Sequence, residues 1–124
     1  MKLTILGPPR TKKNSSIINT RGGRIQKLPS AAYSAWDRMA QLQIAKLWAT
    51  SPLRPPLFLV PVNVKAIFCR EALVGDAVGF YQALADTLEK GGIVENDRLI
   101  VSWDGSRLLK DRDNPRVEIE ITEA

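Results

Sequence analysis

Histidine is absent from the 124 residues, and cysteine occurs once, at Cys69. Without histidine, the protein cannot use a histidine-dependent catalytic triad, a histidine zinc site or an imidazole general base. A lone cysteine excludes an intramolecular disulfide and a cysteine-rich metal site. Hydrolytic chemistry would therefore depend on carboxylates, lysine, hydroxyl groups or that one thiol.

Long apolar runs are also missing from the sequence. No stretch approaches the roughly 20 apolar residues of a membrane-spanning helix, and residues 1–4 follow a strand-like pattern that differs from a secretory signal. We therefore expect a cytoplasmic protein. The length and an ordinary composition, 44% hydrophobic and 25% charged, predict a single globular domain over residues 1–124.

Acidic residues are absent from the first 36 positions, which hold seven of the 18 lysines and arginines. The net charge is +5, so most of the positive excess lies in this first third of the chain. A wholly basic segment is typical of a surface that contacts a phosphate backbone. The alternative interpretation is a solvated face that keeps the protein soluble.

The hydrophobic periodicity predicts the element order β-α-β-α-β-β. We expect strands at 2–7, 57–69, 98–104 and 116–122, and helices at 30–49 and about 77–90. Residues 11–29 are predicted to form a long exposed loop or a loose hairpin, so that a basic exposed segment covers about 10–29. Residues 105–115 are predicted to be a charged loop. This order indicates an α+β domain with helices packed on one face of a small mixed sheet.

Residues 75–100 carry the acids best placed for catalysis. Asp76 precedes an amphipathic helix, and Glu95, Asn96 and Asp97 follow the glycine turn that ends this helix. Magnesium held by two or more carboxylates can neutralise developing charge and supply hydroxide without histidine. Acids at both ends of the helix reach one ion only if the next strand returns beside the segment before Asp76. The alternatives are that Asp76 is a helix N-cap and Asp97 a turn residue.

The same segment resembles the RusA-like crossover junction endodeoxyribonucleases, which are Holliday junction resolvases. The register is fixed by Asp86-x-Leu88, Gly92 and Asn96-Asp97. The opening LTILGPPRTKKNS and the ending VEIEITE also resemble the first and last strands of the family, so the resemblance extends over nearly the whole chain.

The resemblance implies both an activity and a set of site residues. It implies a homodimer that resolves four-way junctions and other branched DNA in recombination and repair by magnesium-dependent phosphodiester hydrolysis. Asp76 and Asp97 correspond to catalytic aspartates that bind the ion, and Asn96 is a further ligand. Asp86 and Glu95 are weaker candidate ligands.

The family motif is incomplete in this sequence. Val78 stands at the position of its second aspartate, Gly79 at its asparagine and Gln82 at its lysine. The loss of each electrostatic contact can lower the rate by on the order of 10²–10³. Candidate replacements for the missing carboxylate and cation are Asp86, Glu95, Glu71, Lys13 and Arg70. The alternative function is therefore a protein that binds branched DNA without cutting it. A third possibility is a basic interaction protein unrelated to DNA.

Six residues are candidates for contacts with the DNA backbone. Basic side chains on an exposed loop can follow a branched backbone and contribute affinity without base specificity. The candidates are Lys12, Lys13, Asn14, Arg21, Arg24 and Arg70. For the tryptophans, packing in the core is favoured over base stacking because they lie at or near periodic apolar positions: Trp36, Trp48 and Trp103.

Overall fold

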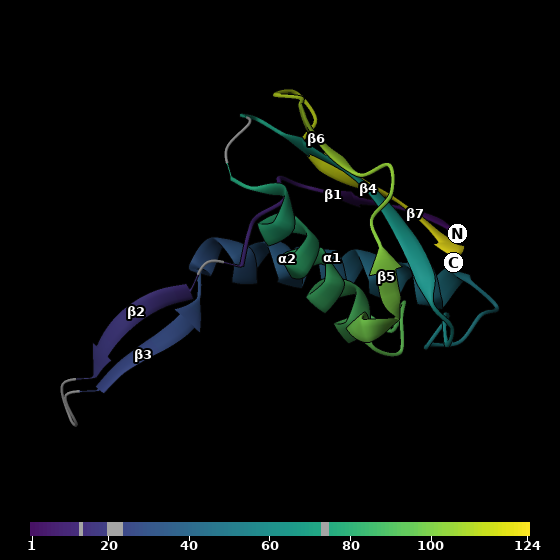
Figure 1. The fold of residues 1–124 in the computed structure, drawn as a ribbon, viewed down its shortest axis with the longest axis horizontal. Coiled ribbons are helices and arrows are strands. Elements are labelled where there is room, and N and C mark those ends of the chain that lie inside the picture. The colour runs from purple at the N-terminus through teal and green to yellow at the C-terminus, as the bar shows by residue number, and fades with distance from the viewer. Residues whose placement is uncertain (13, 20–23, 73–74) are drawn as a thin grey trace.

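The main sheet has five strands, and two helices lie on one of its faces (Figure 1). The computed structural model describes residues 1–12, 14–19, 24–72 and 75–124, and of residues 14–19 and 24–29 only the backbone. The strands of the main sheet are β1 Lys2–Leu6, β4 Val62–Arg70, β5 Ile100–Ser102, β6 Arg107–Lys110 and β7 Arg116–Glu123. The helices are α1 Ala31–Thr50, α2 Ala77–Lys90 and the short 3₁₀ helix η1 Asp97–Leu99. The predicted α+β class with a small mixed sheet is confirmed.

Strand β4 occupies the centre of the sheet. It pairs antiparallel with β7, which pairs antiparallel with β1 at one edge. On its other side β4 pairs in parallel first with β5, at Val62 and Asn63, and then with β6, from Ile67 to Arg70. Thus β5 and β6 follow one another along the same edge of β4, and the chain between them leaves the sheet.

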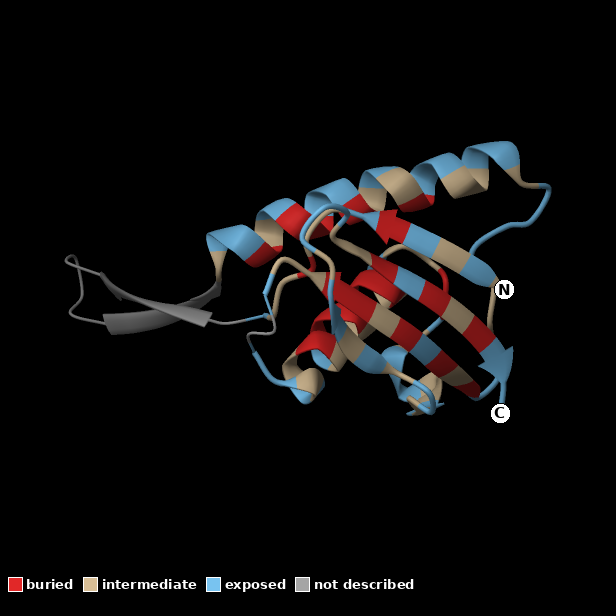
Figure 2. Cartoon of the chain, turned by 90° about the horizontal axis from the view of Figure 1, so that it is seen from above, coloured by how far each residue is buried: buried red, intermediate tan, exposed pale blue. Residues whose placement is uncertain are grey.

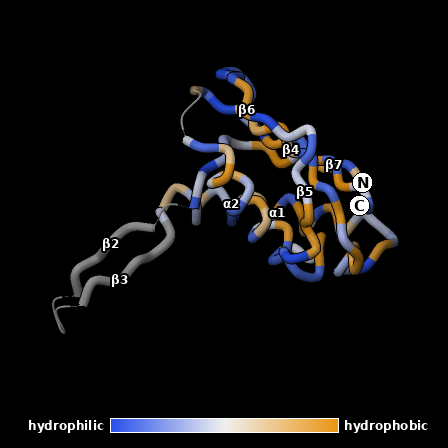
Figure 3. Tube along the Cα trace, in the orientation of Figure 1, coloured by the Kyte–Doolittle hydropathy of each residue, from blue (hydrophilic) through white to orange (hydrophobic). Residues whose placement is uncertain are grey.

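The core lies between the sheet and the two helices. Side chains alternate along β4 and β7, so every second residue is buried, as the red bands of Figure 2 show. Apolar residues gather in these same strands (Figure 3). Burial of one large apolar side chain stabilises the fold by about 1.5–3 kcal/mol. The largest fully buried side chains include Tyr33, Phe68, Phe80, Ile5, Ile44, Leu84 and Leu88.

The two helices begin and end close to where the sequence predicts. Ser30 caps α1, and its hydroxyl accepts a hydrogen bond from the Tyr33 amide at 3.1 Å. Helix α2 ends at a glycine pair, where Gly92 has φ +75° and approaches Pro55. A Cβ atom at position 92 would lie 2.6 Å from the Pro55 Cβ, so both the conformation and the close approach require glycine. In the described part of the chain, no helix is long and apolar enough to cross a membrane.

Three local predictions differ from the structure. The strand predicted at 57–69 begins only at Val62 as β4, and before Pro61 the chain forms an isolated bridge, from Phe58 to Val94. Residues 105–115 are not only a loop, because they contain β6; this prediction was wrong because the strand is short, charged and stabilised by pairing with the distant β4. The strand predicted at 98–104 is reduced to β5, because residues 97–99 form η1.

Of the two structures predicted for residues 11–29, the hairpin is observed. Strands β2 Asn14–Asn19 and β3 Arg24–Pro29 pair antiparallel as a separate two-stranded sheet.

A glutamine side chain lies at the outer edge of β1. The Gln43 Oε1 atom accepts from the Leu6 amide at 2.8 Å, and its Nε2 atom donates to the Leu6 carbonyl at 3.0 Å. Helix α1 thereby satisfies both backbone groups of Leu6 from the side that carries no neighbouring strand in the described sheet.

Candidate functional site

A cleft of about 580 Å³ lies beside α2, η1 and the end of β5. Two of the candidate carboxylates line it, Asp86 from α2 and Asp97 from η1. The cleft thus joins residues from three separate parts of the sequence, because Lys12 also reaches it from the segment before β2. The remaining lining residues are Val78, Tyr81, Gln82, Ala85, Ile100 and Trp103.

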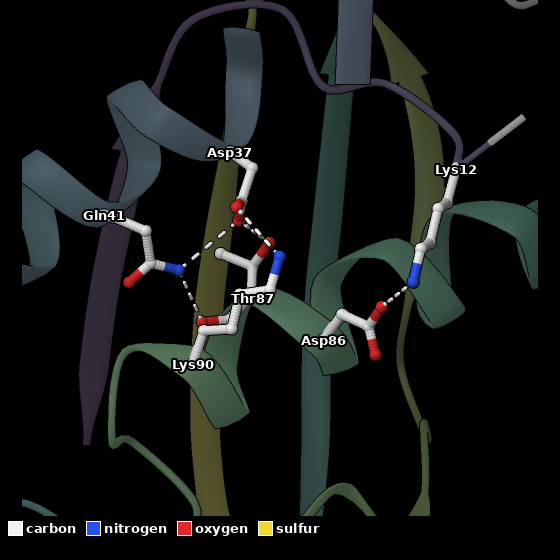
Figure 4. A network of polar contacts seen from close by, with 6 residues as sticks. All are labelled: Lys12, Asp37, Gln41, Asp86, Thr87 and Lys90. Atoms are coloured by element: carbon white, nitrogen blue, oxygen red, sulfur yellow. Dashed lines mark hydrogen bonds and ion pairs between the residues drawn. The ribbon is translucent and has the colours of Figure 1, made fainter. Parts of the chain in front are cut away.

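Lys12 and Asp86 form an ion pair in this cleft (Figure 4). Their side chains are 40% and 27% exposed, so both remain accessible to a ligand. The hydrogen bond from Lys12 to Asp86 raises the pKa of the lysine ammonium above its ordinary value. Sequence reasoning assigns Lys12 to the DNA backbone, whereas the structure places it beside a candidate metal ligand. The ion pair joins residues that are 74 positions apart, and no sequence signal identifies it.

Asp76 is the N-cap of α2. Its Oδ1 atom accepts a hydrogen bond from the Gly79 amide at 2.6 Å, which satisfies one of the exposed amides at the helix start. Asp76 is exposed and lines a smaller neighbouring cavity of about 120 Å³. That cavity shares Lys12 and Gln82 with the main cleft. Asp76 therefore lies next to the cleft, and its predicted role as a metal ligand stays a prediction.

Side-chain hydrogen bonds, from within the turn and from α2, fix the shape of the acidic turn after α2. The Asn96 Oδ1 atom accepts from the backbone amide of Arg98 at 2.9 Å and from its side chain Nε at 3.2 Å. The Asp97 amide donates to Glu89 Oε1 at 3.1 Å, which ties η1 to α2. Asn96 thus acts as a cap, while the exposed Asp97 lines the cleft. Glu95 is exposed and is not part of the described lining of the cleft.

The three positions that depart from the family motif lie along the same side of α2. Val78 lines the cleft with 61% of its surface exposed, and Gln82 lines it one turn further on. Gly79 has little space around it, because an added Cβ would lie 3.1 Å from Asp76 Oδ1 and 3.2 Å from Thr11 Cγ2. A larger residue at position 79 would therefore press on the cap that Asp76 forms.

The donor groups of the cleft fit magnesium in part. Among the described residues, no three acidic or cysteine side chains gather closely enough to form a metal site. Magnesium, however, often uses only one or two protein carboxylates and completes its shell with water and substrate phosphate. Asp86 and Asp97 supply two such carboxylates on one cleft. By donor type, these two side chains suit an ion that completes its shell with a phosphate group.

A buried polar network lies between α1 and α2, beside the cleft (Figure 4). Asp37 is 9% exposed and accepts hydrogen bonds from Thr87 Oγ1 at 2.7 Å, Gln41 Nε2 at 3.3 Å and Lys90 Nζ at 3.2 Å. Burial alone would raise the pKa of Asp37, but these hydrogen bonds outweigh burial and hold the pKa below its ordinary value. Sequence reasoning missed this network. The four-residue spacing of Asp37 and Gln41 on a predicted helix was the one available signal.

Some of the residues predicted to contact DNA are described in the structure, and others lie outside the described residues. Arg70 lies with its guanidinium carbon 4.9 Å from the centre of the Phe80 ring, and burial lowers its pKa. Neighbouring Arg10 forms a 3.3 Å ion pair with Glu71, one of the proposed replacement acids. Neither Arg70 nor Glu71 is part of the described lining of the cleft. Lys13 and Arg21 lie outside the described residues, as do the side chains of Asn14 and Arg24.

The tryptophans differ in their surroundings. Trp36 is 6% exposed and belongs to the core, as predicted. Trp48 is half-buried, and its indole nitrogen donates to the Gly91 carbonyl at 2.8 Å, which joins α1 to the end of α2. Trp103 is half-buried against the core but also lines the cleft, so its assignment to the core alone was incomplete.

A scan against protein-family models finds no match for this sequence, and a search of curated proteins finds none either. The RusA-like resemblance therefore stays a prediction from the residues themselves. Any function must be argued from the geometry of the cleft and the charge of the chain.

Proposed function

We propose that this chain is a RusA-like domain that cuts branched DNA, including four-way junctions, by magnesium-dependent phosphodiester hydrolysis. The observation that supports the proposal is the cleft in which Asp86, Asp97 and Lys12 meet. Carboxylates can hold the magnesium that supplies hydroxide without histidine, and a lysine can neutralise the charge of a phosphate oxygen. We place this activity in the cytoplasm, in recombination and repair.

The residues of the cleft have separate roles in this proposal. Asp86 and Asp97 would hold magnesium, and the bound ion would stabilise negative charge and make hydroxide available near neutral pH. Lys12 donates a hydrogen bond to Asp86. On a long exposed side chain, the same ammonium can donate to a phosphate oxygen and neutralise its charge. Gln82, at the lysine position of the family, contributes an amide donor without charge.

The basic first third of the chain supports DNA as the substrate. The chain passes from Lys12 in the cleft to the start of β2 at Asn14, so the hairpin follows directly from the site. Phosphate contacts made by this segment would supply affinity that is largely independent of sequence. We further propose a homodimer, because two symmetric incisions in a four-way junction require two sites related by a two-fold axis.

The test is the cleavage of a synthetic four-way junction in the presence of magnesium. We expect paired symmetric nicks from the native chain and a loss of about 100-fold or more in rate for Asp97→Asn. Asp113→Asn is the matched control, because it alters an exposed aspartate that is not part of the described cleft lining. Nicks that persist after removal of magnesium, or equal rates in Asp97→Asn and the native chain, would contradict the proposal.

A second candidate is a protein that binds branched DNA without cutting it. It is favoured by Val78 and Gln82, which replace an acid and a cation on the cleft, and by the engagement of Asp76 with the Gly79 amide. The same junction assay separates the two functions. Tight binding without any product at saturating magnesium would support binding alone.

A further inference from the structure

Two aromatic side chains line the cleft. Tyr81 on α2 and Trp103 after β5 stack with ring centres 4.7 Å apart and planes within 8° of each other. On the core side, Phe68 lies 5.9 Å from Tyr81 at a tilt of 33°. Trp103 thus ends a series of rings that runs from the core through Phe68 and Tyr81, and both Tyr81 and Trp103 line the cleft.

The loop that carries Trp103 is anchored to the central strand on both sides of the tryptophan. Asn63 of β4 accepts from Ser102 Oγ at 2.6 Å and from the Asp104 amide at 2.8 Å. Two residues further on, Ser106 Oγ accepts from the Ala66 amide at 2.9 Å and donates to the Val64 carbonyl at 3.1 Å. These contacts hold the loop between β5 and β6, and the stack with Tyr81 holds the indole ring in position.

The apolar part of the cleft is more open than a core would be. Val78 is 61% exposed, and Tyr81, Ile100 and Trp103 are half-buried. A fixed aromatic ring beside exposed apolar surface is a favourable surface for a flat, weakly hydrated ligand. The cleft volume of about 580 Å³ lies within the range of about 300–1,000 Å³ that is usual for small-ligand sites.

We propose that the Tyr81–Trp103 pair in the cleft binds an unpaired nucleobase of the DNA, stacked against Trp103. Lys12, Asp86 and Asp97 line the same cleft and are the groups that the phosphate of that nucleotide meets. Every base has an aromatic face, so such a site prefers an open branch over a paired duplex without reading sequence. This inference names the substrate feature recognised by the site and rests on the proposed action on branched DNA.

The test uses four-way junctions that carry either an unpaired adenine or an abasic residue at the branch, at low salt and without magnesium. The native chain should bind the adenine junction about tenfold more tightly than the abasic one, the magnitude of one base–aromatic stack. Trp103→Leu should bind both equally, and Trp103→Phe should restore most of the preference. Trp48→Phe is the matched control, because Trp48 is not part of the described cleft lining and should leave the preference unchanged. Circular dichroism would verify that each variant is folded.

Each other outcome overturns the inference in a way that can be recognised. If the native chain binds junctions but prefers neither adenine nor the abasic residue, the base site is wrong and the proposed function stands. If Trp103→Leu keeps the native preference, the base is bound elsewhere. If the native chain binds no branched DNA, the proposed function fails, and the base site fails with it.

Discussion

Helix α2 takes part in two lysine–aspartate pairs, through Asp86 and, one turn later, through Lys90, and the pairs differ in what surrounds them (Figure 4). Asp37 and Lys90 meet between the two helices, where Thr87 and Gln41 also donate to the carboxylate. Asp86 is adjacent to Thr87 in sequence, but it faces the cleft, where Lys12 is its ion-pair partner. One carboxylate is therefore enclosed in a network that joins two helices, and the other is accessible to a ligand.

The difference indicates which pair stabilises the fold and which is available for chemistry. A buried carboxylate with several donors cannot be removed without leaving those donors unsatisfied. An exposed ion pair contributes only about 0–1 kcal/mol, because water and salt screen it. The same two residue types can thus serve opposite purposes, and the burial of the carboxylate separates the two pairs.

The largest expected effect is on stability when the buried network is broken. Asp37→Ala should lower the free energy of unfolding by about 2 kcal/mol, because the buried Thr87 hydroxyl loses its acceptor, whereas the Lys90 side chain is 55% exposed and stays hydrated. Urea unfolding followed by circular dichroism measures this loss. Asp86→Ala is the matched control, because it removes the more exposed of the two carboxylates, and it should change the free energy of unfolding by less than about 1 kcal/mol. Equal losses in the two variants would remove the distinction between the pairs.

Acid should also lower the stability of the protein, because it protonates the Asp37 carboxylate. The folded-state pKa of Asp37 is depressed, so its contribution is complete above the ordinary aspartate pKa of about 3.9 and is lost as the pH falls through the folded-state value. The native chain should therefore lose stability below about pH 4 more steeply than Asp37→Asn, as measured by unfolding at a series of pH values. Parallel curves for the two proteins would show that Asp37 does not titrate with a depressed pKa.

The cap at the start of α2 gives a smaller effect. Asp76→Ala should lower the free energy of unfolding by about 1 kcal/mol, because the Gly79 amide loses its acceptor. Asp76→Ser keeps a capping oxygen and should retain most of the stability. If Asp76→Ser is stable but fails to cut junctions, Asp76 has a second role in the site. Full cleavage by Asp76→Ser would show that Asp76 serves only as the N-cap of α2.

The smallest expected change in stability comes from the cleft pair. Lys12→Met should alter the free energy of unfolding by less than about 1 kcal/mol, since both partners are exposed. It should nevertheless weaken junction binding and reduce the slope of log affinity against log salt by about 1, the effect of losing one phosphate contact. Binding titrations at several salt concentrations measure the slope. An unchanged slope would show that Lys12 makes no phosphate contact and that its role is limited to the ion pair with Asp86.

The sequence predicts the regular parts of this fold well, because local signals mark them. Ser30 and the glycine pair after α2 define helix boundaries, and alternation along β4 identifies its buried face. The sequence did not predict strand β6, because β6 is stabilised by pairing with the distant β4 and its own residues show no strand pattern.

For the site, local patterns were informative only within residues 75–100. They located Asp76 and Asp97 at the two ends of one helical segment. They could not show that Asp97 lines the main cleft while Asp76 lines the smaller cavity beside it. Contacts between distant segments, such as Lys12 with Asp86 and Asn63 with the loop of Trp103, leave no periodic signal. They follow from the packing of the whole domain.

The Gln43 side chain at the edge of β1 has a consequence for the behaviour of the protein in concentrated solution. A strand at the edge of a sheet offers unpaired backbone groups on which another chain can add a strand. The Gln43 amide occupies the donor and the acceptor of Leu6, as the peptide group of a further strand would. The side chain of Leu6 is itself 58% exposed, so an open edge here would combine free backbone groups with an apolar surface. Gln43 thus protects the protein against strand addition where it would be most favourable.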